Sequence, residues 1–182
     1  MEIISFLFML SLINPGLPAS QKNRLEITNL KSASGKEYGL NTLVSGELQY
    51  MDRTYQFNYI PEELMGAAHI KTCGNDKLIS ENDICVSFDV DCDLDVYVLF
   101  GDKWPEIPQW LNQFERMRLN VTRQDSRSDN LKGYFSLYKK TFPKGTVTLY
   151  GCSPMEMLKR EWFVKSMGAN YCMYTIAIRK KK

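Results

Sequence analysis

The stretch ICVSFDVDCDLDVYVLFGDKWPEIPQW, from Ile84 to Trp110, decides how the rest of the chain is interpreted. In its first arm, 84–90, apolar and polar residues alternate, and in its second arm, 94–100, both alternating faces carry apolar residues. A period of two with β-branched and aromatic residues is typical of strands. The acidic sequence Asp91-Cys92-Asp93 between the arms predicts a turn. The stretch therefore predicts a β hairpin at the middle of a sheet, with the second arm as a central strand.

The remaining chain shows the same short alternating segments, separated by turn sequences and without a long helical pattern. This spacing predicts an all-β protein, an antiparallel sandwich or jelly roll. Short helical turns are expected within 61–68, 110–114 and 153–168, and a solvated loop at 124–130. The other expected strands are 25–30, 38–43, 48–50, 54–60, 69–73, 118–123, 133–138, 146–150 and 171–178.

The N-terminus resembles a leader for secretion. Residues 3–13 are apolar except for two serines, and Asn14-Pro15-Gly16 ends the run before a segment with small residues. A run of this length followed by a cleavage-like sequence is typical of a signal peptide and too short to span a membrane. We expect a signal peptide at 1–19, cleaved after Ala19 or Ser20, and an extracellular mature protein.

Length and composition predict one domain in the remaining residues, 20–182. The chain has 182 residues, of which 44% are hydrophobic and 24% charged, as in ordinary globular proteins. The net charge is only +2, so no nucleic-acid interface is expected. The one dense basic run, 179–182, predicts a solvated C-terminal tail. The sequence has no second long apolar run, so we expect no transmembrane segment.

The cysteines take their interpretation from the expected compartment. In an oxidising environment five cysteines predict two disulfides and one thiol that is free or links two copies into a dimer. The sequence does not reveal the pairing, although Cys152 and Cys172 flank one segment and Cys92 lies on the expected turn. The five are Cys73, Cys85, Cys92, Cys152 and Cys172. The sequon Asn120-Val121-Thr122 predicts N-glycosylation of Asn120.

A series of short matches, in order along about 34–178, resembles a module of secreted bacterial cell-surface and polysaccharide-degrading proteins. The resemblance implies a β-sandwich like those of galactose-binding and carbohydrate-binding modules, with no catalytic machinery of its own. The chain departs from it in its cysteines, in a segment inserted around 155–169, and in a loop that has Asp102-Lys103 followed by tryptophan. The matching residues are Tyr50 to Phe57, Ile60-Pro61, Leu64, Gly66-Ala67, Ile70-Lys71-Thr72, Asn75-Asp76-Lys77, Ser87-Phe88, Asp95 to Val98, Pro108, Trp110-Leu111, Phe114, Tyr138, Phe142-Pro143, Gly145, Leu149, Gly151 and Met173-Tyr174-Thr175.

The sequence contains no recognisable catalytic motif. It has no nucleophile elbow, zinc-protease helix, P-loop or dinucleotide fingerprint. Its one histidine, His69, lies on an expected strand and is interpreted as a half-buried structural residue. Carboxylates are plentiful, but nothing selects a pair for glycoside hydrolysis. We therefore expect a protein that is not an enzyme and assign no catalytic residue.

The loop after the central strand is the expected binding site. Glycan recognition needs an aromatic face beside polar groups that bind hydroxyls. Trp104 lies in a proline-bounded loop beside Asp102 and Lys103, and Trp110 follows shortly after. The glycan-binding hypothesis is that these four residues form the site. The alternative is that both tryptophans plug the end of the sandwich.

Four aspartates around the expected turn form a second, weaker site hypothesis. Asp89, Asp91, Asp93 and Asp95 alternate with apolar residues, and clustered carboxylates are calcium ligands. Their spacing does not match an EF-hand, and the alternative is that they form the solvated face of the hairpin. No other cofactor is expected.

The sequence thus leads to two functional hypotheses. The first is a secreted, disulfide-bonded glycoprotein that binds extracellular glycans or matrix components without catalysis. The second is a structural component of an extracellular matrix, coat or mineralised organic matrix that has no discrete ligand site.

Overall fold

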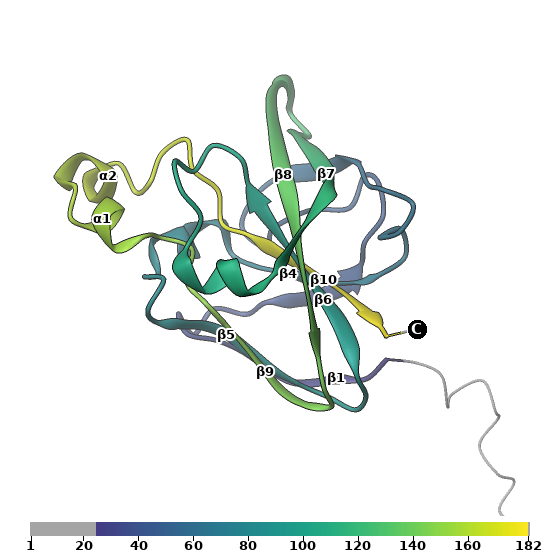
Figure 1. Cartoon of the computed structure of the whole chain (residues 1–182). Coiled ribbons are helices and arrows are strands. Elements are labelled where there is room, and N and C mark those ends of the chain that lie inside the picture. Colours follow the sequence, from purple (N-terminus) through teal and green to yellow (C-terminus); the bar gives the residue numbers. More distant parts are fainter. Residues whose placement is uncertain (1–24, 182) are drawn as a thin grey trace, which may run out of the picture.

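The computed structural model describes residues 25–181, which form a β-sandwich, as the sequence predicts. One sheet has three strands in the order β1-β5-β9, and the other has seven in the order β2-β4-β10-β6-β8-β7-β3, all paired antiparallel (Figure 1). The strands are β1 (Ile27–Ser32), β2 (Gly39–Thr42), β3 (Tyr55–Tyr59), β4 (Ala68–Lys71), β5 (Ile84–Val90), β6 (Leu94–Gly101), β7 (Glu115–Asp125), β8 (Ser128–Phe142), β9 (Gly145–Tyr150) and β10 (Thr175–Lys180).

The predicted hairpin between the two arms of the opening stretch is wrong. Both arms are strands, but β5 pairs with β1 and β9, whereas β6 pairs with β10 and β8 in the other sheet. Asp91-Cys92-Asp93 is therefore the crossing from one sheet to the other. A period of two reports that a strand has a buried face, but it carries no information about the strand beside it. The opening stretch therefore supplies strands to both layers of the sandwich.

β6 is the central strand of the seven-stranded sheet and packs on both faces. Val96, Val98 and Phe100 face the core between the two sheets. Tyr97 and Leu99 face a second core, which this curled sheet forms with Phe57, Leu64, Val121 and Phe135 among others. The expectation of a central strand with two apolar faces is confirmed, and the physical reason is that each face belongs to a different core.

The region predicted as a solvated loop, 124–130, is instead part of a long hairpin. β7 continues to Asp125 and β8 begins at Ser128, and their hairpin projects at the top of Figure 1. The carboxylate of Asp125 accepts hydrogen bonds from Thr54 Oγ1 and from the backbone N–H of Arg127, both at 2.9 Å. The Arg127 bond closes the turn and the Thr54 bond ties it to the segment before β3, so the polar composition of 124–130 reflects a strand tip rather than an unstructured loop.

The helices are short, as expected. Two 3₁₀ turns, η2 (Gly74–Leu78) and η3 (Gln109–Gln113), and two helices, α1 (Met155–Leu158) and α2 (Glu161–Lys165), complete the described elements. α1 and α2 lie outside the two sheets, at the left of Figure 1. At the C-terminus Arg179 and Lys180 belong to β10, so half of the expected basic tail is part of the sheet.

His69 is fully buried on β4 rather than half-buried. Its Nε2 lies 2.7 Å from Thr175 Oγ1, and its ring meets Phe57 edge-on with centroids 5.1 Å apart. Burial, with a smaller contribution from the charge of Lys71, lowers the pKa of His69 to about 3. The imidazole is therefore a neutral part of the second core.

The buried histidine predicts a loss of stability in acid. The unfolded chain binds a proton at His69 near pH 6.5, whereas the folded chain does so only near pH 3. The stabilisation is therefore complete above pH 6.5 and falls, by on the order of 1 kcal/mol per pH unit, as the pH drops towards 3. Urea unfolding across this range should show a steeper pH dependence for the natural chain than for His69→Gln; equal slopes would contradict it.

Gly151 predicts a second effect on stability. A Cβ at this position would lie 2.2 Å from the carbonyl oxygen of Ile79 and 2.3 Å from that of Ser80, both backbone atoms that cannot rotate away. Gly151→Ala should lower the free energy of unfolding by more than about 2 kcal/mol, measured by urea denaturation. The control is Gly35→Ala, which has open space and a φ of +70° and should cost only about 1 kcal/mol. Equal costs would show that the close approach is not the cause.

Candidate functional site

A pocket of about 190 Å³ opens at one end of the seven-stranded sheet. Five segments line it: 50–55 before and within β3, η2, the loop after β6, the β7–β8 hairpin, and residues 170–173 before β10. Its lining combines five tyrosine and phenylalanine rings with five lysine and arginine side chains and one carboxylate. Aromatic surface with a few converging polar groups is the usual composition of a ligand site.

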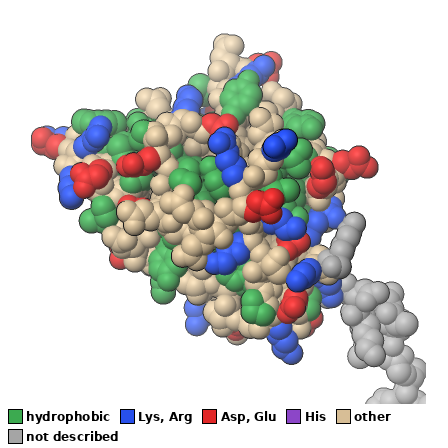
Figure 2. Space-filling view, in the orientation of Figure 1, with side chains coloured by type: hydrophobic (Ala, Val, Ile, Leu, Met, Phe, Trp, Pro, Cys, Tyr) green, Lys and Arg blue, Asp and Glu red, His purple; other side chains and the backbone are tan. Residues whose placement is uncertain are grey.

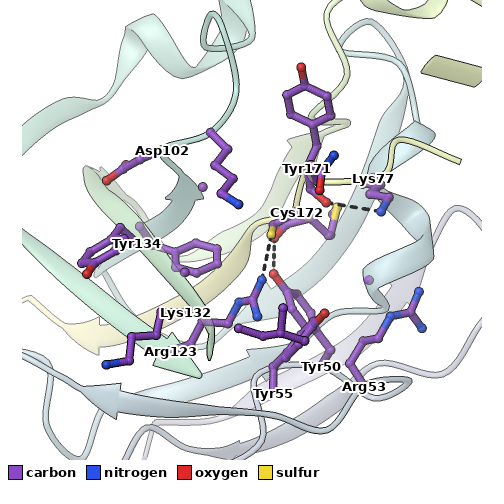
Figure 3. A pocket seen from close by; sticks show the side chains of 18 residues that line it. Tyr50, Arg53, Tyr55, Lys77, Asp102, Arg123, Lys132, Tyr134, Tyr171 and Cys172 are labelled. Carbon is purple, nitrogen blue, oxygen red and sulfur yellow. Dashed lines mark hydrogen bonds between the residues drawn. The ribbon is translucent and has the colours of Figure 1, made fainter. Parts of the chain in front are cut away.

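Arg123 lies at the floor of the pocket and points towards Cys172 (Figure 3). It occupies an inward-facing position on β7 and is only 6% exposed. Its guanidinium carbon lies 3.6 Å from the centre of the Tyr55 ring, and its Nη2 donates to Cys172 Sγ at 3.0 Å. Stacking on a ring stabilises a guanidinium without neutralising it.

The exposed rim of the pocket consists of Asp102, Lys103, Lys132 and Tyr134. Tyr134 is 56% exposed, and its ring lies beside Asp102 in Figure 3. Asp102 Oδ1 accepts the backbone N–H of Ser136 at 2.9 Å, which holds the carboxylate against β8. The rim therefore offers one accessible ring with polar groups of both charges beside it.

The opposite wall is a backbone segment held by side chains. The carbonyls of Tyr171, Cys172, Met173 and Tyr174 precede β10 and accept hydrogen bonds from Lys77 Nζ (3.2 Å), Trp104 Nε1 (2.8 Å), Tyr50 Oη (2.6 Å) and Thr72 Oγ1 (2.7 Å), respectively. Backbone carbonyls outside a ladder need such partners when they are buried. Four side chains thus position this wall, and half-burial lowers the pKa of Lys77.

The structure separates the four residues of the glycan-binding hypothesis. Asp102 and Lys103 line the pocket, whereas the Trp104 ring is covered by Tyr171 and Phe163 and is only 7% exposed. Trp110 packs on Phe114 and Tyr174 and donates to the Gly151 carbonyl at 2.8 Å. Both tryptophans therefore fill the end of the sandwich and fix backbone there. With Trp104 buried and Trp110 half-buried against other rings, Tyr134 is the exposed ring beside Asp102.

The four aspartates of the calcium hypothesis do not form a cluster. Asp89 accepts from Asn29 and Thr146, and Asp95 accepts from Thr141 and pairs with Lys139. Asp91 and Asp93 accept backbone N–H groups at the crossing, from Glu26 and Lys144. Within 25–181 no group of three or more histidine, cysteine or acidic side chains is arranged to hold a metal ion. Each carboxylate instead ties neighbouring segments together.

The prediction of two disulfides is wrong for this structure, in which all five cysteines are thiols and Cys152 and Cys172, which flank one segment, are not bonded. The sulfurs lie on separate elements and contact other groups, such as Arg123 for Cys172 and the Lys77 carbonyl for Cys152. Burial raises the pKa of Cys85 to about 11, so this thiol is inert at neutral pH. Cys92 is partly exposed at the crossing, and a dimer linked through it stays a prediction.

Other expectations about location stay predictions. The expected signal peptide lies outside the described residues, and within them no helix has the length and apolar character to cross a membrane. Asn120 is exposed on β7, opposite Ser136 of β8, so the sequon is accessible.

Comparisons with known proteins support the fold. Neither protein-family models nor curated protein sequences match the chain. A β-glucuronidase from glycoside hydrolase family 2 is similar with a TM-score of 0.66 and 18% identity, over 85% of this chain and 15% of that one. A glycoside hydrolase family 138 enzyme targeting pectin rhamnogalacturonan II is similar with a TM-score of 0.52 and 12% identity, over 87% and 17%. The chain thus shares its fold with a portion of each of these two glycoside hydrolases and spans about one sixth of their length.

The state of the cysteines predicts a thiol count. Ellman's reagent should titrate five thiols in denaturant without reductant, and only Cys92 and Cys172 should react rapidly in the folded protein because the other three are buried. Cys92→Ser and Cys172→Ser should each remove one fast-reacting thiol. A count of three or one in denaturant would instead demonstrate disulfides.

Proposed function

We propose that this chain is an extracellular, non-catalytic module that binds glycans through the pocket at the end of the seven-stranded sheet. The secretory leader expected from the sequence supports the compartment. The likeness to β-sandwich portions of carbohydrate-active enzymes supports the ligand class. The proposal assigns the chain recognition alone and leaves catalysis to other domains or proteins.

The observation that carries the proposal is the exposed ring of Tyr134 at the pocket rim. The C–H face of a sugar stacks on an aromatic ring, while its hydroxyls bind nearby carboxylates and ammonium groups. Asp102 lies beside the ring in Figure 3, Lys103 lines the same pocket, and Lys132 is the ring's near neighbour on β8. Because Asp102 is fixed to the backbone of Ser136, one acceptor is already positioned for a hydroxyl.

Removing the ring should remove most of the affinity. Tyr134→Ala should weaken binding to a retained glycan by about tenfold, measured on a glycan array and then by titration calorimetry. Tyr59→Ala is the matched control, because Tyr59 is 53% exposed but does not line the pocket. Both variants should unfold at the same urea concentration as the natural chain.

Other outcomes would move or remove the site. Equal losses in Tyr134→Ala and Tyr59→Ala, or none in either, would place recognition elsewhere on the molecule. If the folded protein retains no glycan, the binding role fails and a structural role in an extracellular matrix or coat becomes the better account.

A further inference from the structure

The pocket concentrates positive charge in a molecule that has little overall. Its lining includes Arg53, Lys77, Lys103, Arg123 and Lys132 but only one carboxylate, whereas the whole chain has a net charge of +2. Over the face shown in Figure 2 basic and acidic side chains are interspersed. Cations that gather in one concavity raise the local concentration of anions.

These cations are largely without anionic partners. Arg53 pairs with Asp52 at 3.2 Å, but within 25–181 the other four make no ion pair. Asp102, the one carboxylate in the lining, makes no ion pair with any of them within 25–181. The pocket therefore carries an excess of positive charge, with five cationic side chains and one carboxylate in its lining.

Arg123 gives the clearest indication of a ligand. The residue is 94% buried, its Nε has no hydrogen-bond partner, and its one polar contact is from Nη2 to the Cys172 sulfur. A buried charge without a counter-ion costs several kcal/mol, and guanidinium N–H groups match the oxygens of a carboxylate or sulfate in pairs. A buried, unpaired guanidinium facing a pocket fits an anion supplied from outside.

On the adjoining strand β8, a glycine leaves room for the Arg123 side chain. A Cβ on Gly133 of β8 would lie 2.9 Å from Arg123 Nε and 3.1 Å from its guanidinium carbon. On the other side Tyr55 stacks on the group at 3.6 Å. Glycine on one side and a ring on the other hold the guanidinium in place, so it is organised before a ligand arrives.

We propose that the pocket binds an acidic sugar residue, whose carboxylate or sulfate group pairs with Arg123 while Lys103 and Lys132 contact it from the rim. This inference rests on the proposed glycan-binding function and specifies its ligand class. A uronate and a sulfate ester present the same anionic oxygens, so the experiment separates them.

Matched acidic and neutral sugars test the charge requirement. Calorimetry with the full chain should detect binding of oligogalacturonate or of a sulfated dextran oligosaccharide, and at least about tenfold weaker binding of the carboxyl-reduced or unsulfated counterpart. High ionic strength should weaken the acidic ligand because it screens the rim lysines. The acidic series that binds identifies the carboxylate or the sulfate as the natural group.

Charge variants test the location. Lys103→Gln with Lys132→Gln should weaken the acidic ligand at least about fivefold, since two exposed cations leave the rim. The control pair Lys31→Gln and Lys144→Gln removes the same charge from exposed lysines outside the pocket and should change affinity less than about twofold. Arg123→Lys keeps the charge but loses the paired donors and should also weaken binding; if it does not fold, the rim pair decides.

The outcomes separate this inference from the function on which it rests. If neutral and acidic oligosaccharides bind equally, the acidic specificity is wrong while glycan binding stands. If acidic ligands bind but the rim pair and its control behave alike, the pocket is not the site of the acidic group. If the folded chain binds no oligosaccharide of either kind, the glycan-binding function fails first.

Discussion

The two-sided packing of β6 is the constraint on which the rest of the structure depends. Val96, Val98 and Phe100 are buried between the sheets, while Tyr97 and Leu99 are buried in the concave side of the curled sheet. One strand thereby joins both hydrophobic cores, and burial of such side chains contributes about 1.5–3 kcal/mol each. The loop that follows β6 carries Asp102 and Lys103, so the candidate site begins where this doubly anchored strand ends.

The sequence predicts elements better than it predicts their neighbours. The alternation in 84–100 correctly indicates two strands and a central position for the second, because the apolar residues show which faces of each strand are buried. It did not indicate that the strands lie in different sheets, since Val86 and Phe88 would alternate identically beside β6 or beside β9. The same limit applies at 124–130, where polar residues form the tip of a hairpin because one face of each strand there is solvated.

The site was partly predictable for a related reason. Asp102 and Lys103 were identified from the loop that carries them, but Trp104 beside them is buried. An indole can either stack on a sugar or pack in a core, and here its N–H donates to a backbone carbonyl inside the fold. The missed residue with the strongest signal is Arg123. Leu119, Val121 and Arg123 share one face of β7, so the alternation alone places a guanidinium on the inward side. Tyr50, Lys77 and Tyr171 come together around the pocket through tertiary packing, and no local pattern in the sequence predicts that.

The wall formed by 171–174 connects the packing of the fold with the candidate site. This segment has left the sheet, so its successive carbonyls depend on Lys77, Trp104, Tyr50 and Thr72 for hydrogen bonds. Those donors come from three separate parts of the chain, and their convergence fixes the position of Cys172, on which Arg123 rests. The buried guanidinium is therefore held by a network that also completes the backbone hydrogen bonding of the fold. A substitution that relaxed this wall would therefore move the charge of Arg123 as well, because the same donors position both.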